Sequence, residues 1–305
     1  MSIMFPAEIK CSMCGTVSVH DEMISTSTFG TTDLDTRPPE VKRSTMYSWV
    51  QACPECGFAY RKLSEKAAVE KSFLSTQEYK TCDGISFASE LARDFFRYHL
   101  ILSAENKTEK AFWALLSSSW ACDDVNDTQN AVLVRNRAIH LAEILMESHS
   151  MPKKNVETIS LIRADMLRRT SQFEELLEKY EYVEYSEQLL NQILAFQKEM
   201  ARNSRPERFT VQDAKEYFEE DSDEEKEEVI LGKRDELFSQ AVEIMIQEGG
   251  TSITILQRKL RIGYMRAKRL VIAMEALGIA ECENGRYKSK MDMENWEILK
   301  KINPI

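Results

Sequence analysis

The sequence predicts a mostly α-helical protein with small β elements: a small N-terminal domain with two cysteine knuckles, a region of helical hairpins and a C-terminal winged helix. Three observations carry this prediction. They are two Cys-x-x-Cys-Gly motifs, apolar residues at helical spacing through the middle of the chain, and a helix-turn-helix pattern followed by a hairpin pattern. With 305 residues, 43% of them apolar, the chain is long enough for two or three packed domains.

The two cysteine motifs lie at Cys11 and Cys14 and at Cys53 and Cys56. Two residues between the cysteines let both thiolates face one cation, and the glycine after each pair relaxes the backbone of the knuckle. Four thiolates leave no open coordination position for water. We therefore expect one structural Zn²⁺ per chain, in a zinc-knuckle domain at residues 1–84. The 38 residues between the motifs exceed the usual finger spacing and imply an inserted loop or hairpin.

A redox-active motif and an iron–sulfur cluster are the alternative interpretations of these cysteines. A thioredoxin-like site needs one pair in a βαβ context, which the pattern lacks. A cluster usually has less regular cysteine spacing. Zinc is therefore the preferred metal.

The insert between the knuckles runs from an acidic, proline-containing loop into an alternating segment, residues 46–52, which predicts a strand. This region resembles the bacterial domain-of-unknown-function family numbered 2225, whose members carry CPxCG, a TD-rich loop with an arginine, and CPxCGF. The matching residues are Cys11, Cys14, Asp33, Asp35, Arg37, Cys53, Pro54, Cys56, Gly57 and Phe58. Ser12 replaces the first proline. The resemblance implies no known activity, and we interpret the acidic loop as a turn.

From residue 85 to about 203, helical spacing of the apolar residues predicts a stack of antiparallel hairpins. The predicted helices are 87–103, 108–121, 129–148, 155–169, 173–183 and 187–201. Two capping boxes are predicted at the helix starts, Asn106 with Glu109 and Ser171 with Glu174. The rhythm of small and aromatic residues is typical of tetratricopeptide-like repeats, although no regular 34-residue period remains. We assign this domain to residues 85–205 and expect it to bind a protein partner.

Two groups of side chains in this region could suggest function, but the pattern favours structural roles. Trp113 and Trp120 are seven residues apart on one helical face and are expected in the core. Arg163, Arg168 and Arg169 are expected on a solvated face.

An acidic stretch follows the helices. Residues 213–228 hold ten acids and two bases, a net charge of −8. Such a composition opposes compaction, so we predict a flexible acidic linker at residues 206–232.

A helix-turn-helix pattern comes next, after a first predicted helix at residues 233–247. Thr254 and Gln257 form a predicted capping box for a second helix, and Gly263 allows a tight turn. The third helix, residues 264–277, has one apolar stripe and ends at a glycine. The stripe consists of Ala267, Leu270, Val271, Met274 and Leu277.

A predicted hairpin, the wing, completes the domain at residues 233–290. Asn284–Gly285 favours a two-residue turn between strands at residues 279–281 and 286–288. The tail, residues 291–305 with Trp296, is expected to pack back as a short helix.

Positive charge gathers in this domain. Residues 251–290 contain nine Lys or Arg against three acids, a net of +6 in a chain whose total is −10. A surface that contacts phosphates requires such a contrast. The candidate DNA-contacting residues are Arg258, Lys259, Arg261, Met265, Arg266, Lys268, Arg269, Arg286 and Lys288. A cationic helix can also be merely solvated, and winged helices also bind proteins.

The segment QRKLRIGYMRAKRLVIAMEALGI, preceded by DELFSQAVEIMIQEGG, resembles the gamma domain of FtsK-type DNA translocases, whose hallmark is QRxxRIGYxRAxRLxxxMExxGI. The resemblance implies a winged helix that recognises short, oriented, G-rich sites in duplex DNA. Arg266 and Arg269 match basic positions of its recognition helix. Met265 replaces a polar residue, Ile272 an acid and Lys268 a small residue. These departures leave the DNA sequence that it reads open.

The motifs that are missing argue against catalysis. The chain lacks GxxxxGK[ST], HExxH and GxSxG, so we expect a non-enzyme. Without a long apolar run or a signal peptide, we expect a cytoplasmic bacterial protein with no membrane partner.

The leading hypothesis is a DNA-binding adaptor that holds duplex DNA through its winged helix and a protein through its zinc and helical half. The alternative is an interaction scaffold whose winged helix contacts a protein, such as a DNA translocase or a recombinase.

Overall fold

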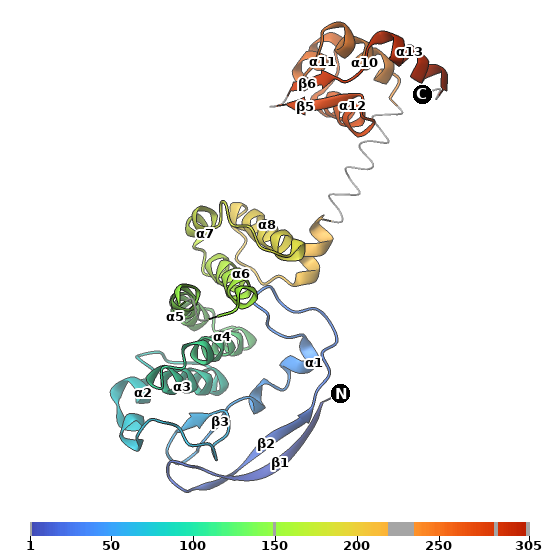
Figure 1. Ribbon diagram of the computed structural model, residues 1–305. Helices are drawn as coiled ribbons and strands as arrows, with labels where there is room; N and C mark the ends of the chain where they lie inside the picture. Colours follow the sequence, from blue (N-terminus) through green and yellow to red (C-terminus); the bar gives the residue numbers. More distant parts are fainter. Residues whose placement is uncertain (1, 149–150, 219–234, 284–285, 303–305) are drawn as a thin grey trace. The chain divides into compact units, whose positions relative to one another are not determined.

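The computed structural model describes residues 2–148, 151–218, 235–283 and 286–302. The chain divides into two compact units, Met1–Lys215 and Glu216–Ile305, and each is described by itself (Figure 1). Helices dominate both, and the named strands of the described residues form three two-stranded antiparallel sheets. Within these described ranges, no helix has both the length and the apolar character needed to cross a membrane.

The first unit begins with a long antiparallel hairpin that the sequence periodicity does not predict. Strand β1 (Ile3–Lys10) pairs with β2 (Val17–Ser25), and the first cysteine knuckle closes the hairpin. Exposed apolar side chains such as Phe5 and Val19 obscure the alternation that marks a half-buried strand. The segment between the two knuckles, where a loop or hairpin was expected, thus contains only the second strand of this hairpin, because β1 precedes Cys11.

The predicted strand at residues 46–52 is wrong in its larger part. Met46–Ser48 forms a 3-10 turn, η1, and only Gln51–Ala52 is extended, as β3. The hydroxyl of Thr45 donates to the carbonyl three residues before it, at 2.7 Å, and accepts from Trp49 Nε1 at 3.1 Å. Such local side-chain bonds compete with an extended backbone. The other small elements here are α1 (Glu40–Arg43), β4 (Ala59–Tyr60), η2 (Lys71–Ser75) and α2 (Gln77–Thr81).

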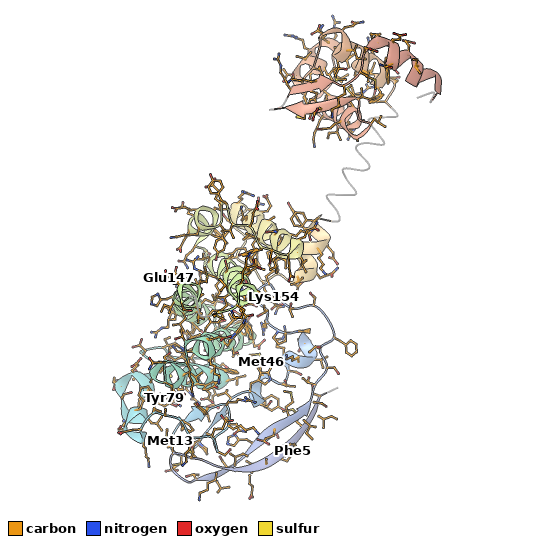
Figure 2. The ribbon with its side chains drawn as sticks, in the orientation of Figure 1. Phe5, Met13, Met46, Tyr79, Glu147 and Lys154 are labelled. Atoms are coloured by element: carbon orange, nitrogen blue, oxygen red, sulfur yellow. The ribbon has the colours of Figure 1, made fainter. Side chains whose placement is uncertain are left out.

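Six helices follow in the first unit, and all were predicted, with ends shifted by a few residues; residues 211–218 form a further helix, where a flexible linker was predicted. They are α3 (Glu90–Ala104), α4 (Thr108–Asp124), α5 (Thr128–Glu147), α6 (Lys153–Arg169), α7 (Phe173–Lys179) and α8 (Gln188–Arg202). From α3 to α6 each helix packs on the next, and α8 packs on α6 and α7. Figure 2 shows side chains filling the spaces between them. This stack is consistent with tetratricopeptide-like hairpins.

The two predicted capping boxes are wrong, because their first residues end a helix instead of starting one. Asn106 and Ser171 have φ of 57° and 60°, in the left-handed region. The N–H of the following residue then donates to the carbonyl five positions back, at 2.9 Å in both turns. Such bonds satisfy the free carbonyls of the preceding helix. Asn126, with φ of 58°, repeats the geometry between α4 and α5, so one type of turn recurs along the stack.

The predicted solvated face of arginines is also wrong. Arg163 and Arg168 are 3% and 0% exposed, and Arg169 lies in the same buried layer. Arg168 Nη2 donates to Asp165 at 2.7 Å, while its Nη1 donates to the carbonyls of Arg205 and Glu207 at 2.6 and 2.7 Å. These bonds hold the chain after α8 against the stack. The start of the predicted linker, up to residue 215, is thus part of the first unit.

His99 on α3 is buried, with Nδ1 3.2 Å from the Ala111 carbonyl oxygen, and burial lowers its pKa to about 4. The unfolded chain protonates this histidine near pH 6.5, so folding stability should fall as the pH decreases from 6.5 towards 4. His99→Asn keeps a donor for Ala111. In urea unfolding followed by helical circular dichroism, wild type should lose roughly 2 kcal/mol more than this variant between pH 7 and 5. The exposed His140→Asn is the matched control, and equal losses for wild type and His99→Asn would contradict the prediction.

The second unit consists of α10 (Phe238–Gln247), α11 (Ile253–Leu260), α12 (Tyr264–Ala276), β5 (Ala280–Glu283), β6 (Arg286–Ser289) and α13 (Met293–Ile302). Three helices followed by a hairpin is the element order of a winged helix, as expected. Its buried core includes the predicted stripe on α12, except Leu277, which is 39% exposed. The predicted tail helix, α13, belongs to the same core, since Trp296 is fully buried with its ring 6.3 Å from that of Phe238.

The turn between α11 and α12 differs in detail from the prediction. Ser252, not Thr254, caps α11, because Ile255 N–H donates to the Ser252 hydroxyl at 3.3 Å. Arg261 has the left-handed φ, 55°, whereas Gly263 has φ −70° and precedes α12 in extended conformation. Position 261 therefore bends the chain at the cost of some backbone strain in a non-glycine residue.

The wing is tied to the helices through a short backbone bridge. Thr251 N–H donates to the Tyr287 carbonyl at 2.7 Å, and Tyr287 N–H donates back at 2.8 Å. Gly250 precedes this bridge with φ 154°, and a Cβ there would lie 3.1 Å from the Tyr287 oxygen. The predicted turn at residues 284–285 lies outside the described residues.

Candidate metal centre and nucleic-acid interface

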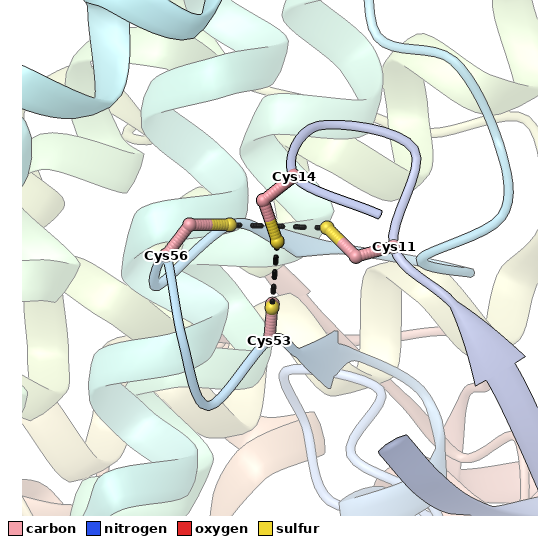
Figure 3. Close-up of side chains that lie close together, drawn as sticks. All are labelled: Cys11, Cys14, Cys53 and Cys56. Atoms are coloured by element: carbon pink, nitrogen blue, oxygen red, sulfur yellow. Dashed lines mark hydrogen bonds between the residues drawn. The ribbon is translucent and has the colours of Figure 1, made fainter. Parts of the chain in front are cut away.

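The four cysteines of the two knuckles meet in the first unit, as predicted (Figure 3). Their sulfur atoms all lie within 4.8 Å of one another, with Cys11 Sγ 3.8 Å from Cys56 Sγ and Cys14 Sγ 3.6 Å from Cys53 Sγ. These separations are too long for a disulfide, which needs about 2.05 Å. All four cysteines are free thiols, and the group could hold one metal ion.

The two knuckles have the same backbone design. Gly15 N–H donates to the Cys11 carbonyl at 2.9 Å, and Gly57 N–H donates to the Cys53 carbonyl at 3.0 Å. Both glycines have the left-handed φ that the turn requires, 81° and 70°. The first knuckle joins β1 to β2 and the second joins β3 to β4, so two hairpins bring the four sulfurs together.

The thiols have different acidities. The Thr16 hydroxyl, with Sγ 3.3 Å away, and the Thr16 backbone N–H favour the thiolate of Cys14 and lower its pKa to about 6. Burial raises the pKa of Cys11 and of Cys56. Four adjacent thiolates would repel one another, so the group needs a bound cation to be fully deprotonated.

In the second unit, α12 carries the central cations of the predicted DNA-binding surface. Lys268 and Arg269 are partly buried, and Arg269 Nε is buried without a hydrogen-bond partner among the described atoms. Leaving a buried N–H donor without a hydrogen-bond acceptor costs free energy, which a ligand with an acceptor group would recover. The side chain of Met265 lies outside the described residues. Ile272 is partly buried.

Arg266, in the first turn of α12, has a partner that the pattern does not indicate. Its Nε and Nη2 donate to the Asp235 carboxylate at 2.7 and 2.8 Å, and Nη2 also lies 3.1 Å from Glu236. The hydrogen bonds from Arg266 hold the pKa of Asp235 below its usual value. Two acids just before α10 therefore orient the guanidinium and offset its positive charge. The sequence signal for these two acids is their place in the DELF segment, which precedes the first helix of the domain.

The other candidate cations lie around α12. Arg258 and Lys259 are exposed in the last turn of α11, where Lys259 pairs with Glu248. Arg261 is exposed in the turn itself. On β6, the exposed cations Arg286 and Lys288 flank the partly buried Tyr287, so alternation places both on the outer face of the wing. The structure thus gathers all the described candidates in one small unit.

Fold and charge define this unit as a helix-turn-helix domain with a wing, a class that includes many DNA-binding domains. Residues 232–288 match the family described as "Ftsk gamma domain". This family is a DNA-binding domain of DNA translocases, so the match supports a DNA-binding role for the second unit. The N-terminal resemblance to the family numbered 2225 stays a prediction.

Three of the similar proteins are named as DNA translocases. "DNA translocase FtsK" of Oceanobacillus iheyensis is 46% identical over 63 residues, 21% of this chain and 8% of that protein. The protein of the same name from Halalkalibacterium halodurans is 42% identical over 69 residues, 23% of this chain and 9% of that protein. "DNA translocase SpoIIIE" of Bacillus subtilis is 43% identical over 69 residues, again 23% and 9%. The matched segment thus spans less than a tenth of each relative. No solved structure matches the chain.

Asp235→Asn should separate the orienting role of this carboxylate from its charge. Removing a negative charge should raise the affinity for duplex DNA, but Arg266 should lose the fixed geometry with which we expect it to contact a base. Since a bidentate Arg–base contact discriminates by about 1–3 kcal/mol, we expect the preference for a good site over a scrambled one to fall roughly fivefold or more. Anisotropy titrations measure both affinities. Glu294→Gln, an exposed acid on α13, is the control; an unchanged preference in Asp235→Asn would contradict this role.

Proposed function

We propose that this protein is a non-enzymatic, cytoplasmic bacterial adaptor that binds duplex DNA through its second unit. The observation that carries the proposal is the match of residues 232–288 to a DNA-binding family, on a unit whose α12 and wing present cations. The helical stack of the first unit is proposed to bind a protein partner. The missing nucleotide-binding motif supports a role without the motor activity of the named translocases.

Binding of the full chain to fluorescent duplexes at two salt concentrations tests this proposal. Phosphate contacts release counterions, so affinity should fall steeply with salt. Affinity no better than that of an unrelated acidic protein would rule out DNA binding. Sites selected from random duplexes would then show whether the oriented, G-rich preference implied by the family resemblance holds, given Met265 and Ile272.

Alanine substitutions should distinguish residues that read bases from residues that hold phosphates. Arg269 lies on the second turn of α12, where a recognition helix faces the major groove, so Arg269→Ala should lower the preference for a selected site by about 1–3 kcal/mol. Arg286 lies on the wing, so Arg286→Ala should weaken binding to all duplexes equally and lower the salt slope by about one. If both variants return the wild-type motif with unchanged slopes, α12 and the wing do not bind DNA in this way.

For the metal we propose one structural Zn²⁺ per chain. With a Zn–S bond of about 2.3 Å, a tetrahedral site places its sulfur atoms about 3.8 Å apart. The Cys11–Cys56 and Cys14–Cys53 sulfur separations of 3.8 and 3.6 Å are close to this value. Four thiolate ligands suit zinc and close its coordination sphere, so the ion would join the two hairpins and leave no site for catalysis.

A second candidate function is a winged helix that contacts a protein, for example a DNA translocase or a recombinase. The pairing of Arg266 with Asp235 and Glu236 favours it, because this pairing reduces the positive charge of α12. Capture of partners with and without nuclease distinguishes the two. A partner that remains after nuclease treatment, together with salt-independent binding, would support the scaffold.

A further inference from the structure

Two adjoining hollows in the first unit serve neither the cysteine cluster nor the cationic surface of the second unit. The first, of about 600 Å³, is lined by residues of β2, of α3 and α4, and of the segment around η1. The second has about 510 Å³. Lys42, Trp49, Trp113 and Ser117 line both, so the hollows form one groove.

Aromatic rings line this groove along its length. Trp113 was expected in the core, but it is only partly buried and lines both hollows, as does the partly buried Trp49. Tyr98 lines the first hollow and Trp120 the second. The indole nitrogens of Trp49 and Trp120 are already bonded, to Thr45 and Asp35. The indole N–H groups of these two tryptophans are therefore not free to bind a ligand, and a ligand would contact the faces of their rings.

The charge of the groove is confined to one end. The first hollow is lined by four cations and two acids, of which Lys62 and Glu22 pair at 2.8 Å. The other charged residues that line the first hollow are three cations, Lys42, Arg61 and Lys110, and one acid, Asp21. Within the described part of the chain, no ion pair engages these three cations. The second hollow has Lys42 as its single charged lining residue.

We propose that this groove binds a nucleoside phosphate, with the base in the second hollow against Trp49 and Trp113 and the phosphates in the first hollow. The volume of each hollow lies within the range of about 300–1,000 Å³ that is usual for small-molecule sites. Aromatic faces stack on bases, and Lys and Arg bind phosphate. A single-stranded nucleic acid would need a basic track along the whole groove, but the second hollow has only Lys42, which it shares with the first hollow.

Calorimetric titration of the full chain with ADP, GDP, adenosine and pyrophosphate tests the proposal. At least one of the two nucleotides should bind one to one, with adenosine and pyrophosphate each much weaker because neither fills both hollows. Trp113→Leu should weaken nucleotide binding by roughly tenfold or more through lost stacking. Lys110→Gln should weaken it too, and this exposed position leaves the fold intact. Trp113→Phe should retain part of the binding.

The matched controls are Tyr182→Leu, whose ring is 87% exposed away from the groove, and Lys80→Gln on α2. Circular dichroism checks the fold of each variant. Failure to bind either nucleotide would overturn the proposal. So would nucleotide binding that survives both Trp113→Leu and Lys110→Gln, equal binding of pyrophosphate, or tight binding of oligothymidylate without nucleotide binding.

Discussion

Protein with serine at both Cys53 and Cys56 is expected to contain no zinc, whereas wild type should contain one Zn²⁺ per chain. Removing two of four ligands destroys the tetrahedral site, and structural zinc in small zinc domains contributes binding free energy of about 10–16 kcal/mol that is coupled to folding. Here the hairpins that carry the knuckles should unfold, and hydrogen exchange across β1 to β4 should become fast. Elemental analysis gives the stoichiometry.

Cys122→Ser is the matched control, because Cys122 is a buried free thiol on α4 outside the cluster. It should keep full metal content. DNA binding by the second unit should survive in the double variant, since that unit has its own core. Zinc retained after Cys53→Ser with Cys56→Ser, or a wild-type content near zero, would show that the assignment is wrong.

Arg169→Met is expected to destabilise the first unit by about 3–5 kcal/mol, because it removes one partner from a buried ionic network. Arg169 Nη2 donates to Asp123 at 2.9 Å, and Nη1 lies 3.4 Å from Asp35, which is fully buried. Asp35 also accepts from Trp120 Nε1 at 2.8 Å. Without Arg169, the buried carboxylate of Asp35 loses its ion pair.

The network joins the acidic loop to three helices. Asp123 on α4 also accepts from Arg135 on α5, and Arg37 in the loop pairs with Asp124. Burial opposes ionisation of Asp123, but Arg135 and Arg169 outweigh it and hold its pKa below the usual value. The loop is therefore a buried structural contact, in agreement with its interpretation as structural.

Arg202→Met is the matched control for Arg169→Met. Both arginines lie in the last turn of a helix and pair with an acid, but Arg202 is 55% exposed and its pair with Glu199 should contribute only about 0–1 kcal/mol. Urea unfolding of the two variants measures the difference. A loss below about 1 kcal/mol in Arg169→Met would mean that the network does not support the fold.

The features that were predicted correctly depend on residues close together in the sequence. The spacing of two cysteines defines a knuckle, and 3.6-residue periodicity defines α3 to α8 and α12. Two of the errors also have a local cause. Asn106 and Ser171 look like caps of the next helix, but the same polar residues suit a left-handed position that ends the previous one. The place of a polar residue between two helices does not by itself show whether the residue ends the first helix or caps the second.

The sequence by itself determined the four-cysteine cluster, the helical stack and the cationic helix-turn-helix, because each is encoded in local spacing and charge. Only the tertiary structure decided that Arg169 is buried against Asp35, 134 residues away, and that Asp235 orients Arg266 from 31 residues away. An arginine has the same local pattern on a solvated face as in a buried ion pair. What distinguishes the two is the loss of water around the charge, and that depends on which distant segments pack there.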